Sequence, residues 1–437
     1  MRKQIQAGIY YGKRTRFSKK KNSLNNGKLL PNSSFALLVL RASENGSAYD
    51  IGMCLRELWR IYTDLERGIT KDLQNCRVPS GSLSVLIAYG PKVFTLPGAK
   101  KKIPSDMNYK QFLPAHSSRP ILKGSGIKYS KKCSKNLAMD DHVVIQLISK
   151  SQLATNRAVV ETWRYLHSDL EEELRHLRLT AFYTGFRRDD GRSWLGFHDE
   201  ISNMKTPEER EAVIKISALD NNLKREDLWT QGGTYMAFLR TEIDIESWWR
   251  TATKLQEIII GRDKLNGSPL VGIDKNGNPI TYARSKFSYQ AVPKLFSDKI
   301  INHPDYYRIR YANFGIESNL DVERSIKALN ESHIGRTRHI EKISSRYAGS
   351  RRIFRQGFDF VEYNHAPEDK RVTVGLNFLS YQNDPGRLFF ILTDPNWLGK
   401  VNFGGGQQNN DLLSVLSCGV FFVPCHSEPF PGSNIFL

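Results

Sequence analysis

The same local pattern occurs twice in this chain, and this repeat limits the fold more than any other feature. Residues 35–62 read FALLVLRASENGSAYDIGMCLRELWRIY, and residues 234–261 read TYMAFLRTEIDIESWWRTATKLQEIIIG. Each copy has an apolar strand that ends in Leu-Arg, then a short turn, an Asp-Ile pair and a helical pattern. A repeated strand and helix of this kind indicates two remote copies of one structural unit.

The first copy continues through three more strands and a second helix. Apolar residues at helical spacing predict helices at residues 50–67 and 153–166, and we expect Trp59 and Trp163 on these helices to pack in the core. Short apolar runs predict strands at residues 34–41, 83–89, 142–148 and 177–186. The resulting order, β-α-β-β-α-β, is typical of a ferredoxin-like α+β unit.

The second copy has a similar start and a long insertion. We expect a strand, a helix and three later apolar strands at residues 233–243, 245–260, 372–381, 388–392 and 417–423. Asp244 is a plausible N-cap for the helix, and Trp248 on that helix is expected in the core. Residues 266–355 form a segment too long for a simple loop, and insertions of this size usually carry function.

These patterns predict an α+β protein with two ferredoxin-like domains, a duplicated β-α-β-β-α-β unit whose antiparallel sheets pack together. A polar, charged segment at residues 205–230 marks the boundary between the copies. We therefore divide the chain into a basic N-terminal arm, an N-terminal domain with a long basic loop at 92–136, and a C-terminal domain. Their predicted ranges are 1–32, 33–215 and 216–437.

Composition excludes several classes of protein. The chain has 437 residues, of which 40% are hydrophobic and 11% aromatic, so it can build a core and global disorder is excluded. No apolar run is long enough to cross a bilayer, and the basic N-terminus lacks the apolar region of a signal peptide. Five scattered cysteines without metal-binding spacing fit free thiols in a reducing compartment. We therefore expect a cytoplasmic protein without a membrane partner.

A formal net charge of +19 permits a polyanionic partner, but the excess is confined to two segments. Residues 1–43 hold ten Lys and Arg and no acidic residue, and residues 92–136 hold eleven with one acidic residue, Asp106. The rest of the chain is nearly neutral. We expect these two segments to serve docking of a polyanion or partner, or localisation, rather than catalysis.

Three short stretches contain residues that could do chemistry. They are GFRRDDGRSWLGFHDEISNM at 185–204, SHIGRTR at 332–338 and RRIFRQGFDF at 351–360, and GLNFLSYQNDPG follows at 375–386. Each candidate also has an ordinary structural explanation. Asp199 could cap a turn, His333 could be a surface or hydrogen-bonded histidine, and Arg355 could form a surface salt bridge.

Together and in this order, the stretches resemble the dye-decolourising (DyP-type) haem peroxidases. The family has a GxxDG stretch, a proximal His in an HI segment and an Arg in an RRIxRxG segment, which residues 196–200, 333–334 and 351–357 resemble. Further segments resemble the family at residues 5–12, 185–186, 258–262, 375–386 and 419–424. The resemblance covers nearly the whole chain and is weakest at residues 92–136 and 266–325.

The resemblance implies two ferredoxin-like halves, with haem b (iron protoporphyrin IX) in the C-terminal half. His333 would be the proximal iron ligand, and Asp199 and Arg355 would act on hydrogen peroxide on the distal side. Leu376 and Phe378 match apolar residues that line the family's distal pocket. The implied activity is reduction of hydrogen peroxide coupled to oxidation of a bulky organic reductant.

The chemistry of these residue types agrees with the implied roles. Haem iron needs one strong axial nitrogen, which a neutral imidazole supplies. A carboxylate can relay a proton between the two peroxide oxygens, and a fixed guanidinium stabilises negative charge as the O–O bond breaks. An acid behind the second nitrogen of His333 would raise its basicity, and Asp384 is a weak candidate because surface solvation is a more common role.

One residue departs from the family pattern. Glu200 stands where the GxxDG stretch has its last Gly, and its charge would raise the pKa of Asp199 and weaken it as a base. The alternative interpretation is therefore a catalytically weakened ferredoxin-like module that binds haem or a polyanion. The sequence leaves open the reductant and whether the protein forms an oligomer.

Overall fold

The structure is a computed structural model of the chain. It describes residues 6, 9, 34–73, 75–107, 135–136, 141–167, 176–188, 190–198, 203–204, 207–217, 224–281, 321–333, 352–363, 371–388 and 412–437. Among these residues, no helix is both long and apolar enough to cross a membrane.

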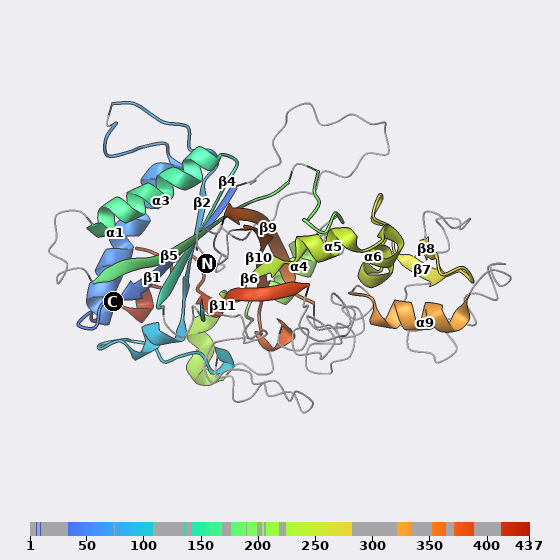
Figure 1. Cartoon of the computed structure of the whole chain (residues 1–437). Coiled ribbons are helices and arrows are strands. Elements are labelled where there is room, and N and C mark those ends of the chain that lie inside the picture. The colour runs from blue at the N-terminus through green and yellow to red at the C-terminus, as the bar shows by residue number, and fades with distance from the viewer. Residues whose placement is uncertain are drawn as a thin grey trace.

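The first half has the predicted order of strands and helices (Figure 1). Its elements are β1 (Ser34–Ala42), α1 (Ala48–Glu66), β2 (Ser84–Tyr89), β4 (Val143–Ser149), α3 (Gln152–His167) and β5 (Leu177–Phe186). The antiparallel strands lie in the order β2-β4-β1-β5, which is the ferredoxin-like arrangement. Short elements between β2 and β4 are η1 (Pro91–Thr95), η2 (Ser105–Met107) and β3 (Lys135–Asn136).

The second half repeats the same strand arrangement in the order β9-β10-β6-β11. These strands are β6 (Thr234–Ile243), β9 (Phe354–Tyr363), β10 (Val372–Gln382) and β11 (Leu413–Val423). Its helices and a hairpin are α5 (Ile245–Arg250), α6 (Thr253–Ile260), β7 (Leu270–Ile273), β8 (Pro279–Thr281) and α9 (Val322–Glu331). α4 (Pro207–Ile214) and η5 (Arg225–Thr230) connect the halves, and η7 (Ser433–Ile435) follows β11. The predicted fold class is confirmed, while the exact domain boundaries stay a prediction.

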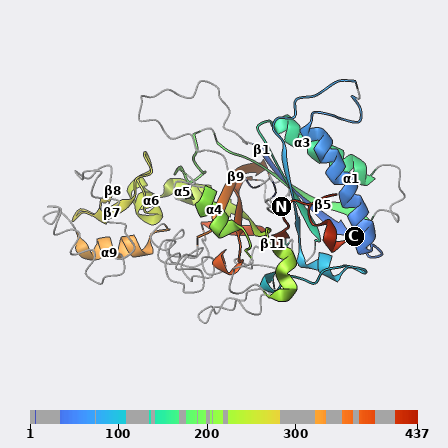
Figure 2. The same ribbon diagram turned by 180° about the vertical axis from the view of Figure 1, so that it is seen from behind.

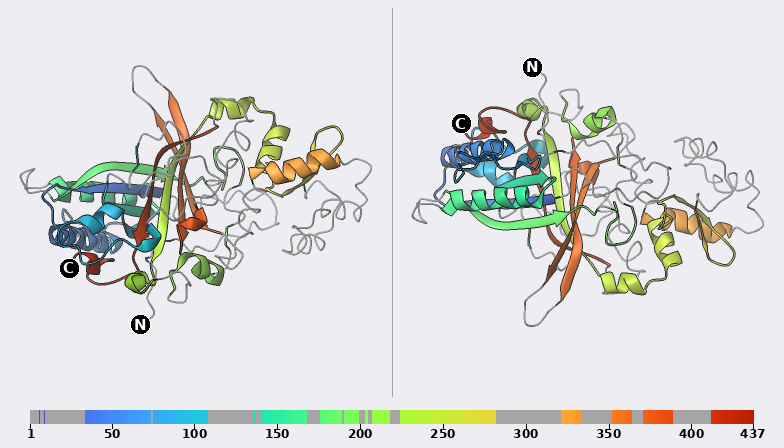
Figure 3. Two further views of the ribbon diagram at one scale, coloured as in Figure 1. Left: turned by 90° about the horizontal axis from the view of Figure 1, so that it is seen from below. Right: turned by 90° about the horizontal axis from the view of Figure 1, so that it is seen from above.

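The two four-stranded arrays join edge to edge at two seams. At one seam Phe186 of β5 pairs with Asp359 of β9, and at the other Phe422 of β11 pairs with Tyr89 of β2. Inner side chains of both arrays form a shared core, in which the rings of Phe35 and Phe358 stack with centroids 4.5 Å apart. The outer face of the first array is covered by α1 and α3, and Figure 3 shows both helices on the side away from β6, β9 and β10.

Helix α1 shows how local sequence sets these elements. Ser47 and Asp50 form a capping box, in which the Ser47 side chain accepts from the Asp50 N–H and the Asp50 side chain accepts from the Ser47 N–H. Such a box satisfies two of the donors that a helix N-terminus leaves open. Leu55 and Leu58 lie on the buried face of the helix and pack onto the sheet.

Three expectations about the helices and strands need correction. The helix expected at residues 245–260 is two helices, because the chain turns at Thr251 and the Gln256 side chain donates to the Trp248 carbonyl at 2.7 Å. Leu388, expected in a strand, lies in a helical turn after Pro385, and residues 389–392 lie outside the described residues. Strand β9 was not predicted, although the stretch that contains it was singled out.

Two residues of the predicted N-terminal arm are packed against the body of the protein. Gln6 is buried, and its side-chain amide donates to the Ile87 and Pro424 carbonyls at 2.9 Å each. It also accepts from the Ile87 N–H at 2.9 Å. Ile9 is buried in the shared core. The amide of Gln6 therefore bridges β2 and the chain after β11, next to the seam at Tyr89.

Candidate functional site

The predicted distal residues lie on one face of the β9–β10 pair. Across this antiparallel pair Arg355 is opposite Ser380, Gly357 opposite Phe378, and Asp359 opposite Leu376. Opposite residues share a face, and alternate residues along a strand point the same way. The other face belongs to the shared core, so Arg355, Leu376 and Phe378 lie together on the outer face, where each is half-buried.

A glycine in the predicted GLNF segment is required by close packing at this site. A Cβ on Gly375 would lie 2.0 Å from the Thr241 carbonyl oxygen and 2.5 Å from the Phe360 ring. Neither neighbour can retreat easily, since one is sheet backbone and the other a buried ring. Gly375 precedes Leu376 in β10, and its lack of a side chain leaves room for the Phe360 ring of β9 to pack against β10.

His333 is positioned by the outlying unit of α6, β7, β8 and α9, which Figure 2 shows on the side away from α1 and α3. Ser325 of α9 is fully buried, and its hydroxyl accepts from the Ile273 N–H of β7 at 2.7 Å. Ala328 packs with Leu270 and Ile273 in a small apolar cluster. His333 follows α9 by two residues, so the docking of α9 on β7 sets where the imidazole lies.

The imidazole of His333 is held neutral. Its pKa is lowered from 6.5 to about 3, chiefly by burial and also by the positive charges of Arg355 and Arg262. Arg355 and His333 are therefore close enough to interact electrostatically. A neutral imidazole has the lone pair that metal ligation requires.

Sequence reasoning missed Arg262 as a neighbour of this site. It is buried, follows α6 directly after Gly261, and donates from Nη1 to the Gly267 carbonyl at 2.7 Å. Gly261 adopts the left-handed conformation, with φ 82°, that commonly ends a helix. A sequence signal for Arg262 was present, because it lies in the segment at residues 258–262 that resembles the family. That resemblance assigned no role to the arginine.

Asp199 and Glu200 lie outside the described residues, but the chain before them is well fixed. The Trp194 indole donates to the Phe360 carbonyl of β9 at 3.2 Å, and the Trp248 indole of α5 donates to the Leu195 carbonyl at 2.9 Å. Phe197 is buried against Trp248. This stretch is thus tied both to the β9 strand of Arg355 and to α5.

Arg192 ties the same stretch to the unit that positions His333. Its guanidinium donates to the carbonyls of Gly196, Lys264 and Leu265 at 2.5, 2.5 and 2.8 Å. Burial lowers the pKa of the neighbouring His198, which favours its neutral form. The segment that leads to Asp199 therefore contacts the chain directly after Arg262.

After Asp199 the chain returns to Arg355 itself. The Asn203 side chain donates from Nδ2 to the Arg355 carbonyl at 2.7 Å and accepts from the Arg355 N–H at 3.3 Å. Asn203 lies within the singled-out stretch at 185–204, yet sequence reasoning gave it no role. An asparagine four residues after an acid carries no signal of a contact with a strand 152 residues later.

These residues fit a haem. His333 supplies one neutral nitrogen donor, and Arg355 supplies a permanent cation. Leu376 and Phe378 give an apolar outer surface next to Arg355, suited to the edge or face of a macrocycle. Four equatorial nitrogens would come from the porphyrin, so a single protein nitrogen meets the requirement of a haem protein.

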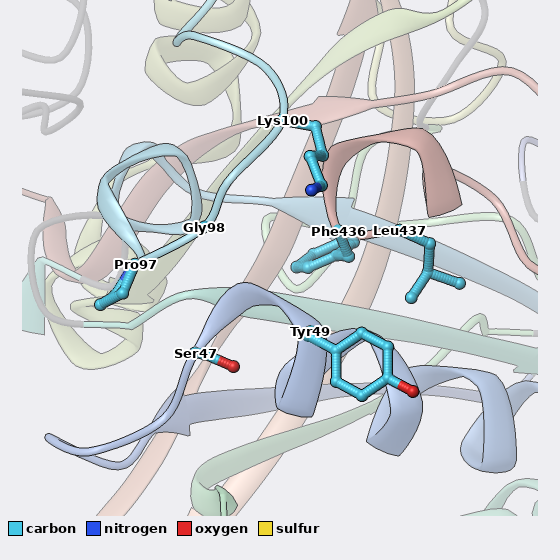
Figure 4. A pocket seen from close by; sticks show the side chains of 7 residues that line it. All are labelled: Ser47, Tyr49, Pro97, Gly98, Lys100, Phe436 and Leu437. Atoms are coloured by element: carbon cyan, nitrogen blue, oxygen red, sulfur yellow. The ribbon is translucent and has the colours of Figure 1, made fainter.

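A separate surface pocket of about 280 Å³ lies on the first half (Figure 4). It is lined by Ser47, Tyr49, Pro97, Gly98, Lys100, Phe436 and Leu437. Of the predicted site residues, those that the structure describes (His333, Arg355, Leu376 and Phe378) do not line it, and Tyr49 in its lining is 61% exposed. This pocket is therefore not part of the candidate site.

Comparison with known proteins identifies the class. The sequence model of the Dyp-type peroxidase C-terminal family matches residues 190–428, which is more than half of the chain. This match places the chain in a class of haem-dependent peroxidases. The chain belongs to the Dyp-type peroxidase family.

Solved structures of that family share the fold. DtpA from Streptomyces lividans in its ferric form has a TM-score of 0.60 at 18% identity, covering 93% of each chain. The DyP-type peroxidase from Cellulomonas bogoriensis has a TM-score of 0.58 at 18% identity, covering 93% of this chain and 94% of that one. A DypB variant from Rhodococcus jostii RHA1 in complex with heme has a TM-score of 0.52 at 18% identity, covering 91% and 94%.

A curated relative matches over a shorter region. Deferrochelatase from Escherichia coli K12 is 36% identical over 78 residues, which are 17% of this chain and 18% of that protein. The match spans about a fifth of the length of that relative. It therefore leaves the activity of the whole chain to be proposed.

Proposed function

We propose that this protein is a dye-decolourising haem peroxidase that reduces hydrogen peroxide and oxidises a bulky organic reductant. Haem b would bind in the C-terminal half, between His333 and the outer face of β9 and β10. The observation that carries the proposal is the placement of Arg355, Leu376 and Phe378 on one face, with the neutral His333 in electrostatic range of Arg355. Family membership supports the same assignment.

His333 would hold the iron on the proximal side. Its pKa of about 3 keeps the imidazole neutral at neutral pH, so protons do not compete with the iron for the ligating nitrogen. When bound, the haem group would supply the two electrons that reduce the peroxide O–O bond, and the organic reductant would restore them. The docking of α9 on β7 restrains the imidazole, because α9 ends two residues before His333.

On the distal side, Arg355 and Asp199 would divide the work on peroxide. Arg355 would donate hydrogen bonds to the oxygen that gains negative charge, and this oxygen becomes the leaving water. Asp199 would accept a proton from one peroxide oxygen and return it to the other. Leu376 and Phe378 would limit water access, which strengthens these interactions by lowering the local dielectric constant.

Reaction with peroxide tests this proposal directly. Haem-loaded protein is mixed with hydrogen peroxide in a stopped-flow spectrophotometer, and the first spectral change is compared with that of Arg355→Leu and Asp199→Asn. Loss of one charge-stabilising donor typically slows such a step by about 10²–10³-fold. Unchanged rates in both variants would contradict the distal roles, and an inactive protein that retains haem would favour the catalytically weakened alternative with Glu200 as its cause.

The basic segments would serve a separate purpose. We infer that the basic arm at residues 1–32 and the basic loop at residues 92–136 dock a polyanion or a partner protein, and that the protein works in the cytoplasm. Each phosphate contact made by Lys or Arg releases counterions, so such binding should weaken steeply with salt. Binding to an anionic polymer that is lost when lysines 100–102 and 131–132 are neutralised would support this role, and unchanged binding would refute it.

A further inference from the structure

Asn203 makes a two-point contact with the backbone of a single residue, Arg355. It donates to the Arg355 carbonyl at 2.7 Å and accepts from the Arg355 N–H at 3.3 Å. Asn203 is 9% exposed, so these bonds form away from bulk water. A carboxamide side chain carries the same donor and acceptor as a peptide group and can take the place of a strand neighbour.

The position of this contact explains why it is needed. Strand β5 ends at Phe186, which pairs with Asp359 of β9. Arg355 lies four residues before Asp359 in β9, beyond the end of β5, and its N–H and C=O face Asn203 on the side away from β10. In an antiparallel ladder, backbone groups that point away from one neighbour need partners on the other side. Asn203 supplies both partners at the position of the proposed catalytic arginine.

The segment that carries Asn203 is itself anchored. The Met204 N–H donates to Asn203 Oδ1 at 3.2 Å, and Met204 is buried in the shared core. Arg210 donates to the Met204 carbonyl at 3.2 Å and stacks over the Phe354 ring, 5.6 Å from its centroid. The burial of the adjacent Met204 therefore holds Asn203 in place by contacts other than its own bonds to Arg355.

We infer that Asn203 is a positioning residue that fixes the backbone of Arg355 and so aims its guanidinium at bound peroxide. This inference rests on the proposed function of Arg355. Hydrogen-bond donors act on a developing charge only within a few tenths of an ångström of the right distance, and a misplacement of 1 Å can slow a reaction by about 10²-fold. Asn203 does not itself touch the reacting atoms.

The opposite seam provides a matched control. Gln6 contacts Ile87 of β2 in the same way, donating to its carbonyl and accepting from its N–H, both at 2.9 Å. Ile87 is two residues from Tyr89, the seam residue that pairs with β11. Gln6→Ala therefore removes an equivalent carboxamide contact from the sheet without touching Arg355.

The test compares Asn203→Ala, Asn203→Asp and Gln6→Ala with wild type in the ferric haem-loaded protein. Fluoride is the probe, because it binds ferric haem opposite the proximal ligand and accepts a hydrogen bond from a nearby guanidinium. Affinity is measured by absorption titration. We expect Asn203→Ala to bind fluoride at least tenfold more weakly and Gln6→Ala to bind as wild type, with the same Soret position in both.

A second readout needs no haem. Hydrogen exchange of the peptide that contains Arg355 should be about tenfold faster in Asn203→Ala and unchanged in Gln6→Ala, because the Arg355 N–H loses its acceptor. If Asn203→Ala does not fold, Asn203→Asp carries the test: it keeps the acceptor and loses the donor, and tenfold weaker fluoride binding is expected.

The outcomes separate the inference from the proposed function. Wild-type fluoride affinity in both Asn203 variants, with Arg355→Leu weakened, would overturn the inference alone. Unchanged affinity in Arg355→Leu would instead refute the proposed role of Arg355. Equal loss of affinity in Asn203→Ala and Gln6→Ala would assign the effect to general stability and also overturn the inference.

Discussion

Replacement of Ser325 by alanine should loosen the unit that positions His333. The Ser325 hydroxyl is fully buried and accepts from the Ile273 N–H at 2.7 Å. Alanine cannot accept a hydrogen bond, so the Ile273 N–H stays buried without a partner in the folded protein. A buried donor left in this way destabilises by about 1–3 kcal/mol.

This loss should act locally. α9 has ten residues and packs through a cluster centred on Leu270, Ile273 and Ala328, so its docking is less stable than the shared core. A change of about 2 kcal/mol raises the population of undocked α9 by about 30-fold. If haem leaves when α9 undocks from β7, haem dissociation should accelerate by about the same factor.

The assay is transfer of haem from the ferric protein to excess apomyoglobin, followed by absorption. Thr162→Val is the matched control, because the Thr162 hydroxyl bonds the buried Tyr62 hydroxyl at 2.7 Å between α1 and α3, far along the chain from His333. We expect faster haem loss only in Ser325→Ala. Equal transfer rates in Ser325→Ala and wild type would refute the role of α9 docking.

Three further predictions concern stability. Gly375→Ala should lower the free energy of unfolding by about 3 kcal/mol, since its Cβ would lie 2.0 Å from the Thr241 carbonyl; a loss below about 1 kcal/mol in denaturant titration would contradict this packing. Arg240→Met should lower it by about 2 kcal/mol, because Arg240 lies 3.5 Å from the Phe360 ring centroid and pairs with Glu362 at 2.6 Å; an unchanged thermal midpoint would argue against these contacts. Burial lowers the pKa of His142 from 6.5 to about 4. The unfolded chain therefore binds a proton that the folded protein does not between these pH values, so stability falls by about 2 kcal/mol as pH drops through this window. His142→Asn should remove that dependence, and an unaltered pH profile would contradict it.

The sequence predicted the elements whose patterns are regular. β1, β2, β4 and β5 lie within one or two residues of their predicted ranges. β1, β2 and β4 are buried apolar runs, whereas β5 is mostly half-buried or exposed and was found through its aromatic and apolar residues. β9 was missed because its first half contains Arg355, Gln356 and Gly357, which break an apolar alternation. These residues are present because that strand serves the site on one face and the shared core on the other.

Helical spacing alone did not decide which face of a helix is buried. Trp248 is buried as predicted, and Trp59 packs against the core. The prediction for Trp163 was wrong: it is 53% exposed on the outer face of α3, where it stacks on His167 with centroids 4.8 Å apart. An aromatic side chain on an amphipathic helix can lie on the buried or the exposed face. For Trp163, the way α3 packs on the sheet determines that the side chain lies on the exposed face.

The candidate site was predicted through motif order more than through chemistry. His333, Arg355, Leu376 and Phe378 are described residues, and the β9–β10 register brings the last three to one face. Asn203 carried no signal in the sequence, and Arg262 lay in a family-like segment that gave it no role, since both roles depend on contacts between distant segments. The catalytic role of Asp199 stays a prediction, as does the expectation that Glu200 raises its pKa.

The absorption spectrum of the haem-loaded ferric protein with and without His333 tests the central claim most directly. Wild type should show the Soret band of a haem with a single imidazole ligand, and His333→Ala should lose that spectrum and recover it when imidazole is added. Ser332→Ala, adjacent in the chain, serves as the control and should keep the wild-type spectrum. An unchanged Soret band in His333→Ala would show that another residue holds the iron, and would contradict the site derived from α9, β9 and β10.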